Sequence, residues 1–166
     1  MVGLNKYITI ATDISCDDKN KISTWACYIR HDGGAIKLTG QFKEYQKNSH
    51  VAETYALINA LKIAEANIAS WNDSIIIIYN EIEYALSPLM TKGGKVKLHD
   101  SARADAILSV AMPILQSAKS WQLRDVKAHF NNWKKSNSPG RYVLNRWCDK
   151  ESRNLLKKIR KLQETT

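Results

Sequence analysis

Three stretches near the amino end are rich in β-branched and aromatic residues, and we predict that they form strands. They cover residues 6–12, 24–30 and 35–41. Such residues favour an extended backbone. Asp32-Gly33-Gly34 separates the second stretch from the third and is typical of a tight turn. The pattern therefore predicts three strands, of which the last two form a hairpin.

The next segment, residues 51–66, changes to a helical pattern. Its apolar residues are spaced for one helical stripe, at Val51, Tyr55, Ile58, Leu61 and Ile63. This spacing predicts a helix. Asn48 or Ser49 stands just before the stripe and is suited to be the N-cap.

Residues 74–79, SIIIIY, are a continuous apolar run of strand length. A run without polar alternation is typical of a strand that is buried on both faces in the centre of a sheet. We therefore expect helices to cover both faces of that sheet.

The second half of the chain alternates between helical and strand patterns. We predict helices over residues 82–90, 102–117 and 148–162, and a strand over residues 121–128. Together with the first half, this order predicts an α/β fold, with a five-stranded mixed β-sheet and α-helices on both faces. The length of 166 residues fits a single domain, residues 1–166.

Composition and cysteine usage favour a globular protein of the cytoplasm. Apolar residues make up 44% of the chain and charged residues 25%. No stretch approaches the roughly 18 apolar residues of a membrane span, and residues 1–10 lack the regions of a signal peptide. Cys16, Cys27 and Cys148 are an odd number without CxxC spacing, so we expect reduced thiols rather than disulfides or a zinc site.

Positive charge is concentrated in the last quarter of the chain. The formal net charge is +9, and 13 of the 25 Lys and Arg residues lie between Lys119 and Lys161. Only Asp125, Asp149 and Glu151 oppose them in this segment. A basic surface attracts phosphate backbones, so nucleic acid is a candidate partner, although a solvated cationic face has the same composition.

Four acidic residues fall at the predicted ends of elements. Asp13 follows the first strand, Glu53 lies in the first turn of the first helix, Glu81 follows the buried strand, and Asp149 starts the last helix. If the strands are neighbours, these carboxylates converge on one rim, where hard oxygen ligands select Mg²⁺ or Mn²⁺. Two such ions suit a phosphodiester displacement. Taken one at a time, the same acids are ordinary helix-end or turn residues.

Five sequence blocks surround these acids. They are ITIATDISC (8–16), NSHVAE followed by YALINAL (48–53 and 55–61), YNEIEYAL (79–86), VKAH (126–129) and NRWCDKESR (145–153). In this order they resemble the signatures of the ribonuclease H type 1 family, which hydrolyses the RNA strand of RNA/DNA hybrids. The resemblance covers most of the chain and implies a ribonuclease H-like fold.

The resemblance also implies roles for particular residues. Asp13, Glu53, Glu81 and Asp149 would be catalytic metal ligands for two Mg²⁺ or Mn²⁺ ions, with Asp13 bridging them. His129 would assist proton transfer to the leaving group or product release. The residues that would contact the RNA strand are Ser15, Cys16, Asn48 and Ser49.

Two departures from the family pattern concern the site itself. Glu81 stands where an Asp is usual, and the adjacent Asn80 offers a second alignment in which a neutral amide replaces the carboxylate. The Glu81 alignment keeps Tyr84 in register without a gap. Ile14 replaces the usual Gly after the first acid, where a β-branched side chain obstructs close approach of a nucleic-acid backbone.

A third departure is the 15-residue segment between His129 and Asn145, which is longer than the usual family loop. The cluster Asn137-Ser138-Pro139-Gly140 marks it as a loop. Its basic and aromatic residues are suited to phosphate contact and to stacking: Lys134, Lys135, Arg141, Trp133 and Tyr142. An ordinary solvated loop is the competing interpretation.

The sequence thus predicts a metal-dependent endonuclease, a ribonuclease H acting on RNA/DNA hybrids as a monomer. One alternative is a nucleic-acid-binding module that kept this fold and lost turnover. A second is a DNA-directed nuclease of the same superfold. Metal binding distinguishes the first alternative, and a 2′-deoxy substrate distinguishes the second.

Overall fold

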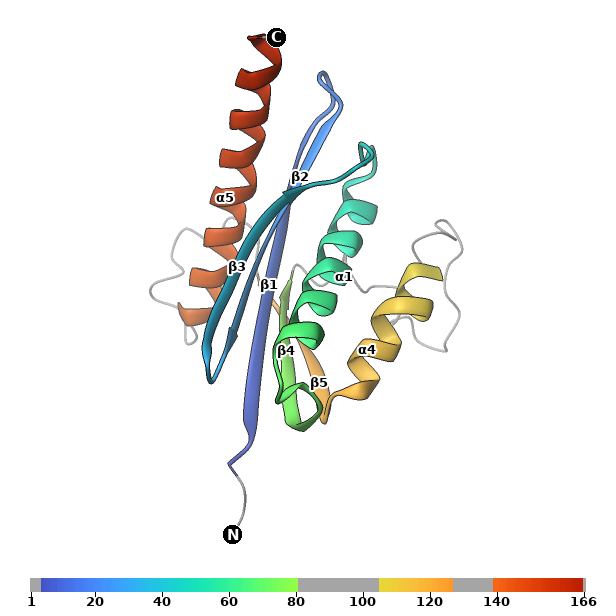
Figure 1. The fold of residues 1–166 in the computed structure, drawn as a ribbon, viewed down its shortest axis with the longest axis vertical. Coiled ribbons are helices and arrows are strands. Elements are labelled where there is room, and N and C mark those ends of the chain that lie inside the picture. Colours follow the sequence, from blue (N-terminus) through green and yellow to red (C-terminus); the bar gives the residue numbers. More distant parts are fainter. Residues whose placement is uncertain (1–3, 81–104, 127–138, 166) are drawn as a thin grey trace.

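The computed structural model describes residues 4–80, 105–126 and 139–165. It contains a five-stranded sheet in the order β3-β2-β1-β4-β5 (Figure 1). The strands are β1 (Lys6–Asp17), β2 (Ile22–His31), β3 (Gly34–Gln41), β4 (Ser74–Asn80) and β5 (Ser120–Asp125). β1, β2 and β3 pair antiparallel, whereas β1, β4 and β5 pair parallel. The predicted mixed α/β sheet is confirmed.

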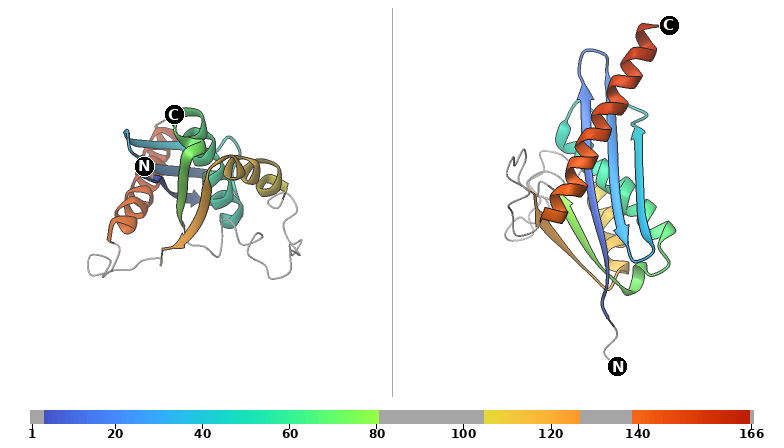
Figure 2. Two further views of the ribbon diagram at one scale, coloured as in Figure 1. Left: turned by 90° about the horizontal axis from the view of Figure 1, so that it is seen from below. Right: turned by 90° about the vertical axis from the view of Figure 1, so that its left-hand side faces the viewer.

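Helices lie on both faces of this sheet, as predicted (Figure 2). They are α1 (Ser49–Asn67), α4 (Met112–Ser117) and α5 (Pro139–Glu164). A 3-10 turn at Trp71–Asp73 precedes β4, and a π-helical turn at Ile107–Ala111 precedes α4. None of the described helices is both long and apolar enough to cross a membrane.

Two hydrophobic clusters separate the faces. The larger joins α1 and α4 to the sheet and includes Ile8, Ile10, Leu57, Leu61, Ile76, Ile78 and Leu115. The smaller lies under α5 and includes Ala11, Ala26, Ile77, Tyr79, Leu144 and Cys148. Several members of the second cluster are small, so α5 approaches the strands closely.

The first helix begins where its polar flank predicts. Asn48 rather than Ser49 is the N-cap, and its side-chain oxygen accepts hydrogen bonds from the backbone of His50 at 2.9 Å and of Val51 at 3.4 Å. The predicted helix at residues 82–90 lies outside the described residues. Within the predicted helix at 102–117, the described residues from 105 onward are helical up to Ser117.

The prediction that Asp13 ends the first strand is wrong. β1 continues to Asp17 because β2 pairs with this whole extension, from Asp13↔Ala26 to Asp17↔Ile22. The carboxylate of Asp17 then accepts backbone hydrogen bonds from Lys19 and Asn20, which ends the strand in a turn. Local sequence does not reveal a pairing partner, so the strand end was misplaced.

The start of the last helix was also predicted wrongly. α5 begins at Pro139, so the end of the supposed loop, residues 139–144, is helical. A buried stripe with four-residue spacing explains the longer helix, at Leu144, Cys148, Ser152 and Leu156. Proline is tolerated in a first helical turn because its missing N–H has no partner there. Tyr142 is only 5% exposed, so it packs in the core rather than offering its ring for stacking.

Candidate active site

The site begins at a stretch of β1 that extends past β4. In the described part of the chain, the pairing of β1 with β4 ends at Ala11↔Tyr79, whereas β1 runs on to Asp17. Asp13 lies two residues beyond the last pair and is half-buried. Its Oδ1 accepts a hydrogen bond from the backbone N–H of Ile14 at 2.8 Å. Beyond β4, groups from the two faces of the sheet can approach one another.

Glu53 reaches this place from α1. It is the fifth residue of a helix that begins at Ser49, and the first turn of this helix contains no acidic residue. Glu53 therefore lies in the second turn of α1 and not in the first turn, as the sequence predicted. The side chain is half-buried, and its Oε2 atom is shielded from solvent. A shielded carboxylate oxygen binds a cation more strongly than an exposed one, because water screens the charge less.

Cys148 of α5 packs against β1 two residues before Asp13. The thiol is fully buried and donates a hydrogen bond to the backbone carbonyl of Ala11 at 3.4 Å. Desolvation raises the pKa of the Cys148 thiol, and the negative charges of Asp13 and Glu53 raise that pKa further. Carboxylates from a strand and from α1 thus act on one thiol of the helix that covers the opposite face.

Asp149 follows Cys148 in the chain but lies in the interior of α5, not at the predicted start of the helix. Its Oδ1 forms an ion pair with Arg153 at 2.8 Å, and the side chains of Asp149 and Arg153 are 38% and 55% exposed. An exposed pair of this kind contributes about 0–1 kcal/mol. A cation could therefore compete with Arg153 for the Asp149 carboxylate at small cost.

The described residues provide part of a metal site. Asp13, Glu53 and Asp149 have the hard oxygen donors that Mg²⁺ and Mn²⁺ prefer. Within residues 4–80, 105–126 and 139–165, however, no group of three His, Cys, Asp or Glu side chains is arranged to hold an ion. Glu81 and His129 lie outside the described residues, and Asn80 ends β4 just before Glu81. The donor chemistry fits such an ion, with a ligand set that these residues alone do not complete.

The residues expected to contact RNA lie beside this site. Ser15 is buried, and its hydroxyl is 3.1 Å from the hydroxyl of Ser152 on α5. The half-buried Cys16 thiol approaches the backbone carbonyl of Gln46 at 3.8 Å, and desolvation raises its pKa. Asn48 caps α1, and Ser49 is exposed in its first turn. Their contact with RNA stays a prediction.

The basic residues of the predicted insertion are only partly described. Arg141 lies in the first turn of α5, and nothing is described of its side chain. Lys134 and Lys135 lie outside the described residues. Their predicted contacts with substrate stay predictions.

Two features of α5 were not predicted from the sequence. Ser152 joins the helix to the sheet: Thr24 donates a hydrogen bond to its carbonyl at 2.8 Å, besides the Ser15 contact. Cys148 was considered only as a reduced thiol. The four-residue spacing of Leu144, Cys148 and Ser152 was the signal that these residues face the sheet.

An aromatic and basic cluster also lies next to Asp149. Tyr28 and Trp147 pack edge to face, with ring centroids 5.6 Å apart. The Lys37 ammonium lies 4.6 Å from the Tyr28 ring centroid and 5.8 Å from that of Trp147. A cavity of about 470 Å³ adjoins them, lined by Val143, Arg146, Trp147, Asp149 and Lys150.

No known protein-family profile matches the sequence, and no curated protein matches it either. Solved structures do match the fold. RNase H1 from the halophilic archaeon Halobacterium salinarum NRC-1 is 16% identical with a TM-score of 0.56, over 76% of this chain and 89% of that one. The N-terminal RNase H domain of a Mycobacterium tuberculosis protein is 12% identical with a TM-score of 0.56, over 78% and 88%.

A third match is LC11-RNase H1 in complex with an RNA/DNA hybrid, at 17% identity and a TM-score of 0.54, over 75% of this chain and 88% of that one. These similarities establish that the chain has the ribonuclease H-like fold. The fold that the five sequence blocks implied is thereby confirmed.

Proposed function

We propose that this protein is a metal-dependent endonuclease that hydrolyses the RNA strand of RNA/DNA hybrids. The observation that carries the proposal is that Asp13, past the last β1–β4 pair, and the solvent-shielded carboxylate of Glu53 belong to two elements that pack against each other, β1 and α1. Carboxylate oxygens are the ligands that Mg²⁺ and Mn²⁺ prefer. The ribonuclease H-like fold, shared with a protein solved in complex with a hybrid, indicates the substrate class.

Asp13, Glu53 and Asp149 would hold the divalent ions, with Glu81 as the fourth ligand that the sequence resemblance implies. Ions bound there supply positive charge that stabilises the attacking and leaving oxygens of the phosphodiester. Before an ion binds, Arg153 neutralises the carboxylate of Asp149. His129 is proposed to pass a proton at the leaving oxygen.

The surface beside Asp149 suits an approaching phosphate backbone. Arg146 and Lys150 line the cavity that Asp149 and Trp147 also line. Lys37 adds a third cation on the same face, held against Trp147. Positive side chains beside the carboxylates would hold the phosphates of a nucleic acid near the scissile bond.

The first test is cleavage of an end-labelled RNA/DNA hybrid in Mg²⁺ and in Mn²⁺, beside matched duplex DNA and duplex RNA. We expect RNA-strand cleavage in the hybrid alone, abolished by EDTA. Asp13→Asn should lower the rate by at least about 100-fold. Asp73→Asn is the matched control, because this exposed acid lies at the opposite end of the sheet, before β4, and should leave the rate unchanged.

A binding measurement accompanies the cleavage assay. Mg²⁺ should raise the melting temperature of the wild-type protein and of Asp73→Asn, because a ligand that binds only the folded state stabilises it. Asp13→Asn should show no such rise. Cleavage of duplex DNA, or cleavage that survives Asp13→Asn, would contradict the proposal.

A second candidate is a nucleic-acid-binding module that kept the fold without turnover. One observation favours it: the carboxylate of Asp149 is already paired with Arg153. Hybrid binding at equal affinity with and without Mg²⁺, with no cleavage, would establish this alternative instead.

A further inference from the structure

A second cavity lies on the other flank of α1. It has a volume of about 680 Å³ and is lined by Trp25, Gln41, Phe42, Lys43, Glu44, Gln46, Tyr55, Asn59, Lys62 and Ile63. The volume is within the range of about 300–1,000 Å³ typical of ligand sites. The lining combines three aromatic side chains with two lysines, and Glu44 is the one acid among these residues.

The aromatic wall is built by the pairing of β2 with β3. Trp25 stands opposite Gly40, and a Cβ atom at Gly40 would lie 2.7 Å from three atoms of the indole ring. The indole therefore lies flat across the edge strand, in the space that the glycine leaves. Tyr55 and Ile63 of α1 are half-buried beside it and pack against the same core. An aromatic surface is thus held in place while remaining partly exposed.

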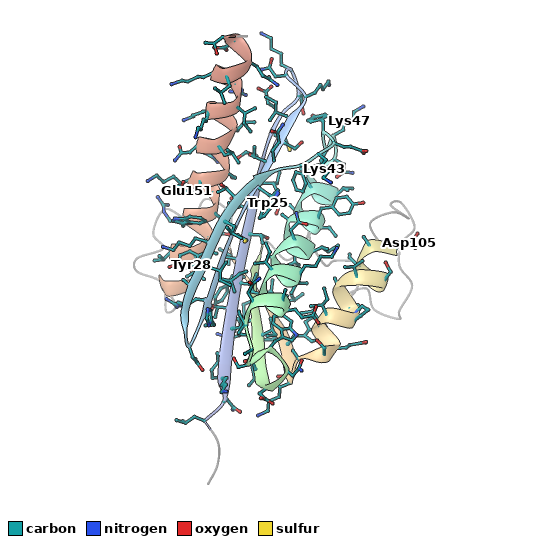
Figure 3. All side chains as sticks on the ribbon, viewed as in Figure 1. Trp25, Tyr28, Lys43, Lys47, Asp105 and Glu151 are labelled. Carbon is teal, nitrogen blue, oxygen red and sulfur yellow. The ribbon has the colours of Figure 1, made fainter. Side chains whose placement is uncertain are left out.

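The cations of this cavity stand at its rim. Lys43 and Lys62 are exposed, one on the loop after β3 and the other on α1. Figure 3 shows Lys43 and Lys47 together on that loop, near the end of β3 and the start of α1, with Trp25 below them. A partly exposed aromatic floor with lysines above it is the arrangement by which proteins bind single-stranded nucleic acid.

This cavity is separate from the candidate active site, although residues of α1 contribute to both. Tyr55, Asn59 and Lys62 lie roughly 180–240° around the α1 axis from Glu53, at 3.6 residues per turn. The two sites therefore occupy opposite flanks of one helix. Gln46 connects them: it lines the cavity, and its carbonyl lies 3.8 Å from the thiol of Cys16, three residues beyond Asp13 on β1.

We propose that this cavity binds an unpaired nucleotide of a single-stranded extension of the nucleic acid held at the candidate active site. The base stacks on Trp25 and Tyr55, and the phosphates contact Lys43 and Lys62. The proposal rests on the proposed function only for the choice of nucleic acid as the ligand. It adds a preference for hybrids that carry a single-stranded end.

The test compares the affinity of the full chain for two hybrids by fluorescence anisotropy. Both have the same paired segment with a 2′-O-methylated RNA strand, which blocks cleavage. One is blunt, and the other carries a six-nucleotide thymidine extension. Because stacking of one base contributes on the scale of a tenfold affinity change, we expect the extended hybrid to bind about tenfold more tightly.

Two variants remove the proposed contacts without emptying the core. Tyr55→Leu keeps an apolar side chain against the sheet and removes the aromatic ring. Lys43→Gln with Lys62→Gln removes two exposed charges. Each should reduce the gain from the extension to about twofold or less, with the affinity for the blunt hybrid little changed.

Matched controls change the same residue types at the other end of the sheet. Tyr7→Leu alters a tyrosine that is 47% exposed at the start of β1. Lys6→Gln with Lys119→Gln removes two further exposed charges near it. Both controls should retain the full gain from the extension, which separates a local contact from a general effect of charge.

A positional readout completes the test. A 4-thiothymidine in the extension should cross-link under ultraviolet light to Trp25 or Tyr55, as mapped by mass spectrometry. Equal affinities for the two hybrids, a gain that survives both variants, or cross-links confined to other elements would overturn the proposal. Cleavage of an unmodified hybrid is measured in parallel. Tighter binding of the extended hybrid without any cleavage would overturn the proposed nuclease activity alone. Cleavage without tighter binding of the extended hybrid would overturn the proposed nucleotide site alone.

Discussion

The contact between Gly40 and Trp25 makes a quantitative prediction for Gly40→Ala. The new Cβ atom would lie 2.7 Å from the indole atoms Cε2, Cζ2 and Nε1, well inside the optimal separation of about 3.5–4.0 Å. The ring must therefore move, which costs about 1–3 kcal/mol. Alanine offsets about 0.5–1 kcal/mol of this, because it loses less backbone entropy than glycine in a strand. The net loss should be about 0.5–2 kcal/mol.

Thermal unfolding measures this loss. For a chain of this length, about 1 kcal/mol lowers the melting temperature by about 2–4 °C, so Gly40→Ala should lower it by about 1–8 °C. A double-mutant cycle with Trp25→Leu identifies the cause. Without the indole, Gly40→Ala should become neutral or stabilising, because only the entropic gain remains.

Gly34→Ala is the matched control for this cycle. Gly34 has a φ of 131°, and nothing lies within 4 Å of a Cβ atom there, so its cost comes from backbone strain alone. Trp25→Leu should not change that cost. If Gly40→Ala destabilises the wild-type and Trp25→Leu proteins equally, the indole does not occupy the place we assign to it.

Two further predictions concern the contacts that hold the site together. Ser152→Ala leaves the buried Ser15 hydroxyl without its partner and should destabilise the fold by about 1–3 kcal/mol in urea unfolding, whereas the exposed Asn154→Ala on the same helix should change it little. Hydrogen bonds from the side chain and backbone of Asn20 hold the pKa of Asp17 well below its ordinary value of 3.8. The stabilisation from this lowered pKa is complete above pH 4 and is lost as the pH falls below it, so Asp17→Asn should be less stable than wild type at pH 7, by a margin that shrinks below pH 4. A constant margin from pH 7 to pH 2 would contradict this assignment.

Local patterns in the sequence were sufficient to predict most elements of this fold. The run SIIIIY became a central strand, β4, because continuous apolar residues require burial on both faces. Asn48 became the N-cap of α1, since its side chain satisfies backbone donors within the next three residues. Both features depend on residues that are close together in the chain, so a single sequence is sufficient to predict them.

The arrangement of the site was decided by tertiary structure. Asp13 was predicted at a strand end and Asp149 at a helix start, yet both lie inside their elements. Their positions depend on where β4 stops pairing with β1 and on the face of α5 that packs on the sheet. Register and packing join residues more than a hundred positions apart, such as Ala11 and Cys148, and no local pattern encodes such a distance.

The aromatic cavity has the same origin. Trp25, Phe42 and Tyr55 come from a strand, a loop and a helix, and each alone has an unremarkable local sequence. The glycine that makes room for the indole stands fifteen residues along the chain, opposite it only because β2 and β3 pair in this register. The sequence by itself determined which segments become strands and helices, because periodicity and capping act between near neighbours. Only the folded chain decided which side chains meet, because that depends on strand register and helix packing.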